Sequence, residues 1–262
     1  MTTATAVRGT MPLTRHVAEA RTRAMRAAVA LAIGVVIGFV FSEQILEVLR
    51  APIEQIAFTR EASLNFDSVT GAFDLRLKIA IFTGIVVSSP VWLFELFAFV
   101  SPGLTRRERR LTFGYSGAAL ALFLGGCAFG FALFPHMVQL LTGFASDADS
   151  TILNAGYYVD FVLKVVVATG VAFVLPVILV LLNALGVVSA VTLRRGWRWI
   201  VVVIAVFSAF VTPAADVMSM FLVAVPMAAL FGAALLITHL HDRRMLRRSD
   251  PIRSDTPQGS AY

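Results

Sequence analysis

Residues 161–185 have the sequence FVLKVVVATGVAFVLPVILVLLNAL, an apolar run in which Lys164 is the single charged side chain. A transmembrane helix needs about 20 apolar residues, because each adds about 1.5 Å and the hydrocarbon core of a bilayer is about 30 Å thick. Backbone amides cannot stay unpaired in lipid, so a run of this kind must be helical. The stretch therefore predicts a membrane-spanning helix.

Comparable apolar runs recur along the 262-residue chain, at 27–42, 77–100, 111–135, 198–212 and 217–238. Charged residues make up 15% of the chain, whereas soluble domains carry about 25%. The sequence thus predicts an all-α polytopic membrane protein with six transmembrane helices. The fifth run is short, since it lies between Trp197 and Thr212, and a helix of that length crosses incompletely or thins the bilayer.

The charges between these runs alternate in sign. Four segments carry most of the 22 lysines and arginines: the N-terminal arm, residues 106–110, residues 194–198 and the C-terminal tail. The segments between them are acidic or carry little charge. Cytoplasmic loops hold an excess of Lys and Arg, so this pattern predicts that both chain ends lie in the cytoplasm, the N-in, C-in topology.

Composition divides the chain into a cytoplasmic N-terminal arm, a six-helix transmembrane domain and a cytoplasmic, disordered tail, at residues 1–26, 27–238 and 239–262. Within the arm, residues 12–26 predict a short amphipathic helix on the cytoplasmic face. Apolar residues at helical spacing over 43–57 predict a helix on the outer surface, interrupted near Pro52. A continuation of the first membrane helix is the alternative there.

Motifs for nucleotide binding or metal catalysis are absent from the sequence, which has no Walker A loop, no GxGxxG and no HExxH. The single cysteine, Cys127, has no partner for a disulfide or a CxxC site. His239 and His241 are two positions apart and do not share a helical face, so they do not predict a metal site. The sequence indicates a protein that is not an enzyme and uses no cofactor.

Two acids stand alone among arginines. Glu19 lies in HVAEARTR, residues 16–23, and Glu108 lies in LTRRERR, residues 104–110. A lone acid in a basic segment is usually a local ion-pair partner, worth under about 1 kcal/mol when exposed. The alternative is a site for a cationic ligand, because carboxylates accept two parallel hydrogen bonds from a guanidinium group.

These segments resemble the TatC family, the multispanning receptor subunit of the twin-arginine protein translocase, over roughly residues 11–240. Residues 11–23 are similar to the family's N-terminal motif MPL…HLxELRxR, and residues 89–110 to its most specific stretch, …P…W.F..PGL...ERR. Phe131 to Pro135 resembles the FxxFP ending of the third helix. Residues 212–219 resemble a TPxxD…S turn between the last two helices.

The resemblance implies a cup-shaped, six-helix, N-in, C-in fold with short fifth and sixth spans. It implies a receptor for signal peptides with consecutive arginines, and the core scaffold of the Sec-independent translocase that exports folded proteins using the proton-motive force. The implied partners are single-span TatA-type and TatB-type subunits and further copies of the receptor. The implied location is the cytoplasmic membrane of a prokaryote.

Carried over by position, Glu19 and Glu108 would contact the two signal-peptide arginines, with Arg21 organising the patch beside Glu19. Glu95 would be an additional contact for a cation. A polar turn that docks a partner subunit would consist of Thr212, Pro213, Asp216 and Ser219.

Several positions depart from the family pattern, among them Val69, Gly71 and Phe231-Gly232. Ala20 stands at a usual leucine, and Glu95 stands where glutamine is frequent. Val174 replaces a frequent Glu or Gln in the fourth span, and Met220 lies near a frequent glutamine. The alternative function is a six-helix secondary transporter of a small cationic solute, using Glu19, Glu108 and Glu95.

Overall fold

A computed structural model describes residues 13–50, 63–65, 70–100, 106–142, 152–212 and 217–249. Nearly all of them are helical, as expected for backbone that must satisfy its own hydrogen bonds in lipid. The elements are α1 (Leu13–Val40), β1 (Ser63–Asn65), α3 (Gly71–Val87), α4 (Ser89–Val100), α5 (Arg106–Thr142), β2 (Ile152–Asn154), α6 (Ala155–Ala184), α7 (Ala190–Arg195), α8 (Trp197–Val211) and α9 (Val217–Ser249). A further helical segment covers 42–50.

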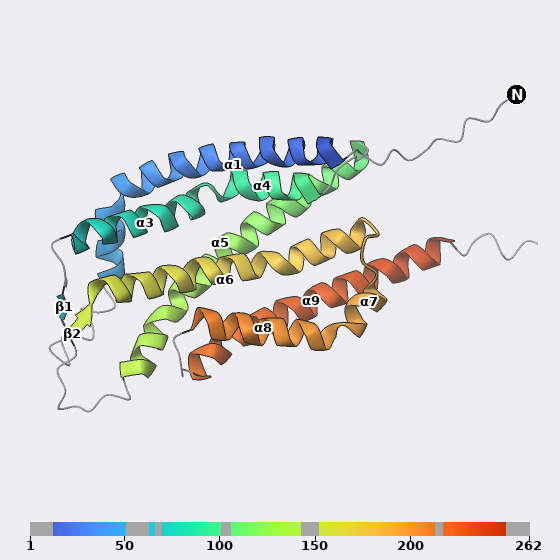
Figure 1. The fold of residues 1–262 in the computed structure, drawn as a ribbon. Coiled ribbons are helices and arrows are strands. Elements are labelled where there is room, and N and C mark those ends of the chain that lie inside the picture. The colour runs from blue at the N-terminus through green and yellow to red at the C-terminus, as the bar shows by residue number, and fades with distance from the viewer. Residues whose placement is uncertain are drawn as a thin grey trace, which may run out of the picture.

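Helix α6 lies at the centre of the fold and contacts α3, α5, α8 and α9. Figure 1 shows α1, α3 and α4 on one side of α6, and α8 and α9 on the other. The start of α1 and the end of α9 lie at the same end of the helices. Three clusters of buried apolar side chains fill the spaces between these helices, and residues of α6 belong to all three.

Each of the six predicted runs falls within helical structure. Among the described residues, four helices are long and apolar enough to cross a membrane, or five if α3 and α4 together form one bent span. The fifth run forms α8, and its 15 residues confirm that it is short. The count of six spans and the N-in, C-in topology remain predictions.

The break between α3 and α4 bends this part of the chain by 54° at Ser88. Pro90 has no N–H with which to continue the helical hydrogen bonds. The indole N–H of Trp92 instead donates to the carbonyl of Ile85 at 2.9 Å, so a carbonyl close to the break keeps a partner. The bend directs α4 along α1, which it contacts.

Three expectations at the chain ends are wrong. Residues 12–26 do not form a separate helix, because α1 continues without a break from Leu13 to Val40. The alanine-rich start of this helix has high helix propensity and contains no proline or glycine that would end it before Gly34. The sixth span is not short, since α9 has 33 residues and its apolar part, Met220–Leu240, has 21. Residues 239–249 of the predicted disordered tail belong to α9 and are helical, since the arginines and leucines there also favour helix; residues 250–262 lie outside the described part of the chain.

The helix predicted within 43–57 is confirmed over 42–50, which follow α1 after a turn at Phe41. Its Leu46 and Leu49 are buried against α3 and α6 residues in one cluster, and Tyr158 donates a hydrogen bond to the carbonyl of Leu49 at 2.9 Å. Pro52 lies outside the described residues. In Figure 1 this segment turns away from the axis of α1 at the end of the fold opposite the start of α1.

The sequence did not predict a short parallel pair of strands. Strand β1 pairs with β2 in the register Ser63↔Ile152, Leu64↔Leu153 and Asn65↔Asn154. The pair joins two segments that lie between predicted spans and are far apart in the chain. Three residues per strand are too few for an alternating pattern to stand out in a sequence.

Glycines bring α1 and α3 into close contact. A Cβ on Gly34 would lie 2.7 Å from the carbonyl oxygen of Gly84, and one on Gly38 would lie 2.6 Å from that of Ala80. Small residues allow membrane helices to approach closely enough for strong van der Waals contact. Since the opposing atoms belong to backbone, they cannot move aside as a flexible side chain would.

We therefore expect Gly34→Ala to lower the free energy of unfolding by about 1–3 kcal/mol, as overpacking does. The matched control is Gly117→Ala, because a Cβ there meets no atom within 4 Å. The control should be neutral or slightly stabilising, since alanine favours helix. Thermal unfolding in detergent compares the two variants, and equal melting temperatures would contradict this account of the α1–α3 contact.

Candidate functional site

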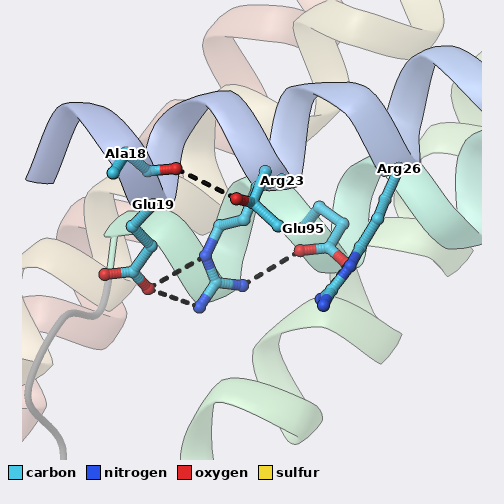
Figure 2. A network of polar contacts seen from close by, with 6 residues as sticks. Ala18, Glu19, Arg23, Arg26 and Glu95 are labelled. Carbon is cyan, nitrogen blue, oxygen red and sulfur yellow. Dashed lines mark hydrogen bonds and ion pairs between the residues drawn. The ribbon is translucent and has the colours of Figure 1, made fainter. Parts of the chain in front are cut away.

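Charged side chains from α1 and α4 meet where these helices lie side by side (Figure 2). On α1, Glu19, Arg23 and Arg26 are spaced by four and three residues, so they share one helical face. On α4, Glu95 lies opposite them. We refer to these four side chains as the α1–α4 charge cluster.

Arg23 is the centre of the cluster. Its Nε and Nη2 donate to Oε1 of Glu19 at 3.1 and 2.7 Å, and its Nη1 donates to Oε2 of Glu95 at 3.0 Å. One guanidinium group thus joins two carboxylates from different helices, and all three of its nitrogens donate. Hydrogen bonds of this charged kind are stronger than those between neutral groups.

Glu95 is the most buried charge in the cluster, with 9% of its side chain exposed. A buried carboxylate is costly unless it is paired and hydrogen-bonded. Besides Arg23, the Nη1 of Arg26 lies 3.4 Å from Oε1 of Glu95, but Arg26 is 64% exposed. Arg23 is 23% exposed and lies closer to Glu95, so it contributes the larger share of the stabilisation that offsets the burial of the Glu95 carboxylate.

A cleft of about 290 Å³ lies beside the cluster, between α1 and α4. Arg23 and Glu95 form its polar wall, and the other lining residues are Ala20, Ala24, Ala27, Trp92, Leu96 and Phe99. Two of the departures from the family pattern, Ala20 and Glu95, therefore line the same cleft. The three alanines leave space next to the guanidinium group that longer side chains would fill.

The structure brings together two of the predicted binding residues, Glu19 and Glu95. Arg21 is different: it is exposed and lines a groove along α1 with Val17, Met25 and Val29. Among the described ion pairs, Glu19 is joined to Arg23 and not to Arg21. Arg21 is two residues from Glu19, whereas helix neighbours are three or four residues apart.

The other predicted residues are only partly described. Glu108 lies in α5, but its side chain is outside the described part of the chain, as is that of Ser219 in α9. Pro213 and Asp216 fall in the gap 213–216. Thr212 is described: it is buried at the end of α8, and its hydroxyl donates to the carbonyl of Ser208 at 2.9 Å.

Sequence reasoning missed the roles of Arg23 and Arg26. The spacing of Glu19 and Arg23, four residues apart, was a signal for their ion pair. Nothing in the sequence indicated that Glu95, far away in the chain, would share Arg23. Within the described ranges, no three His, Cys, Asp or Glu side chains are grouped so as to hold a metal ion.

Known proteins of one family are similar to this chain. A family model described as Sec-independent protein translocase protein (TatC) matches residues 15–226. The TatC protein of Xylanimonas cellulosilytica is 43% identical over 243 residues, which cover 92% of this chain and 88% of that protein. The TatC protein of Rothia mucilaginosa is 37% identical over 253 residues, 95% of this chain and 86% of that protein.

A solved structure has the same fold. The crystal structure of a twin arginine translocase receptor, TatC, superposes with a TM-score of 0.77 at 29% identity, and the match covers 87% of this chain and all of that one.

We expect Glu95→Ala to lower the free energy of unfolding by about 3 kcal/mol, because it leaves Arg23 partly buried without its second carboxylate. Glu43→Ala is the matched control, since Glu43 is 76% exposed and lies 3.4 Å from Arg76. Loss of that surface pair should change stability by less than about 1 kcal/mol. Thermal unfolding in detergent measures both, and similar melting temperatures for the two variants would contradict a structural role for Glu95.

Proposed function

This chain belongs to the TatC family of Sec-independent protein translocase proteins, and on that premise we propose that it is the membrane receptor for twin-arginine signal peptides. As a family member it is a multi-pass membrane protein and a transport component, not an enzyme. Membership of this family favours protein translocation over the transport of a small cationic solute, the alternative raised by the sequence.

The observation that carries the proposal is the environment of Glu19. Its carboxylate is 30% exposed and already accepts two hydrogen bonds from a guanidinium group, that of Arg23. Both bonds go to Oε1, and among the described contacts none goes to Oε2. The position and orientation of Glu19 therefore suit it to hold a guanidinium group.

The second arginine of a signal peptide is proposed to bind Glu108, at the start of α5. Arginines surround both acids in the sequence, so a peptide that misses Glu19 and Glu108 is repelled. A lysine has the same charge but lacks the planar fork of the guanidinium group, and it should bind less well. Arg21, exposed next to this site, is proposed to contribute to the repulsion.

The wider assembly is part of the proposal. The receptor would associate with TatA-type and TatB-type single-span subunits and with further copies of itself, and export of folded proteins would use the proton-motive force. The turn after α8, with Thr212, Pro213, Asp216 and Ser219, is the proposed contact for a partner helix. Thr212, at the C-terminal end of α8, supports this, since it precedes the connection to α9 and these two helices contact each other.

We also propose the N-in, C-in topology with six crossings. The start of α1 and the end of α9 lie at the same end of the fold, which agrees with an even number of crossings (Figure 1). The start of α1, the short helix α7 and the end of α9 lie at that end, and each of these described segments contains arginines, as the positive-inside rule requires of the cytoplasmic side.

Binding to a labelled signal peptide tests the receptor function. Purified protein in nanodiscs should bind an Arg-Arg peptide more tightly than a Lys-Lys peptide. Glu19→Ala and Glu108→Ala should each weaken Arg-Arg binding by at least about tenfold, because a hydrogen bond between charged groups contributes about 1.5–3 kcal/mol. Fluorescence anisotropy gives both dissociation constants.

The control for this measurement is Glu43→Ala, which removes an exposed acid in the helical segment 42–50 that follows α1. It should leave peptide binding unchanged. Equal affinity for the two peptides, or unchanged Arg-Arg binding in both the Glu19 and the Glu108 variants, would reject the proposed site.

Cysteine labelling tests the topology. In a Cys127→Ala background, Thr70→Cys should react with a membrane-impermeant maleimide added to intact cells, because Thr70 is exposed at the end of the fold opposite the start of α1. Val191→Cys, in α7 and 71% exposed, should react only after the cells are opened. The reverse labelling pattern would show that the orientation is inverted.

A further inference from the structure

The α1–α4 charge cluster contains an arginine of the protein itself at the carboxylate proposed to receive an arginine of the signal peptide. Arg23 uses Nε and Nη2 on Oε1 of Glu19, at 3.1 and 2.7 Å. This is the kind of contact that an incoming guanidinium group would make. Oε1 of Glu19 is thus already occupied by a guanidinium group of the protein.

A ligand must therefore compete with Arg23 for Glu19. A peptide arginine has the same planar fork as Arg23 and can replace its two donors in kind. A lysine has a compact, strongly hydrated ammonium group and cannot reproduce two in-plane hydrogen bonds to one oxygen. Competition from Arg23 therefore weakens the binding of an ammonium group to Glu19 more than it weakens the binding of a guanidinium group.

Glu95 determines the free energy needed to displace Arg23 from Glu19. The hydrogen bond from Nη1 to Oε2 of Glu95, at 3.0 Å, does not involve Glu19. When Arg23 leaves Glu19, it keeps this second carboxylate, and the cleft of about 290 Å³ beside both side chains gives it room to move. A partly buried charge therefore retains a partner, which lowers the cost of the exchange.

We propose that Arg23 is a specificity-determining residue that occupies Glu19 until a peptide arginine displaces it, and that Glu95 is the positioning residue that receives Arg23. This inference rests on the proposed function, namely that Glu19 binds an arginine of the signal peptide. It assigns Glu95 to Arg23 and not to the peptide, in contrast to the additional-contact role expected from sequence.

The test is a double-mutant cycle of Arg23→Gln and Glu95→Gln, with both peptides bound to protein in nanodiscs. Arg23→Gln should strengthen Lys-Lys binding and reduce the preference for Arg-Arg about fivefold, since one charged contact no longer competes. Glu95→Gln should weaken Arg-Arg binding about fivefold, because Arg23 loses the carboxylate that receives it.

The double variant separates this mechanism from direct contact. Without Arg23 there is nothing for Glu95 to receive, so Glu95→Gln should have no effect on peptide binding in the Arg23→Gln background. If Glu95 instead contacts the peptide, its loss should weaken Arg-Arg binding by the same factor in both backgrounds, and that result would overturn the inference. The double variant removes one charge of each sign, so it also avoids an uncompensated buried carboxylate.

Two further variants keep the test decisive if Arg23→Gln folds poorly. Arg23→Lys retains the charge without the fork, and it should also reduce the preference for Arg-Arg. Arg76→Gln is the control, because Arg76 lies on α3, is 46% exposed and pairs with Glu43 at 3.4 Å, outside the α1–α4 charge cluster. Its preference for Arg-Arg should equal that of the wild type.

The outcomes distinguish the inference from the function on which it rests. If the wild type prefers Arg-Arg and Glu19→Gln abolishes binding, but no Arg23 variant changes the preference, the receptor function stands and the role of Arg23 is rejected. If Glu19→Gln binds Arg-Arg as the wild type does, the proposed function fails, and the inference fails with it.

Discussion

The structure depends on one constraint, that backbone groups inside a bilayer must find their hydrogen-bond partners within the protein. This requirement makes the apolar runs helical and limits where a helix can break. Beside the break at Ser88, the indole of Trp92 donates to the carbonyl of Ile85, so this backbone oxygen has a partner within the protein. The resulting bend of 54° directs α4 along α1 and so places Glu95 opposite Arg23.

The second determinant is electrostatic. Glu95 is almost fully buried, and the cost of burying a carboxylate makes its pairing with Arg23 a condition of the α1–α4 contact. The same arginine holds Glu19 at the exposed edge of the cluster. A structural ion pair and a proposed binding site therefore share one guanidinium group, and this sharing is the physical basis for coupling ligand binding to the position of Arg23.

Much of the fold and part of the site could be predicted from sequence. The apolar runs located the helices, and the lone acid Glu19 marked the cluster, because both signals are local. The continuity of α1 across residue 26, the length of α9 and the β1–β2 pair were missed. In α1 and α9, hydrophobicity predicts where lipid begins, whereas helix propensity decides where a helix ends, and polar residues can continue a helix beyond the membrane.

The sequence by itself determined the class of the protein, the location of its apolar helices and its family, since composition, apolar runs and motifs can be read from the chain without its three-dimensional structure. The tertiary structure alone decided which charges meet. Helical spacing distinguishes Arg23 from Arg21 as a partner of Glu19, but only the packing of α1 against α4 directs Arg23 to Glu95. The pairing of Arg23 with Glu95 joins residues 72 positions apart. Such a contact depends on how two helices pack, and no local pattern in the chain encodes it.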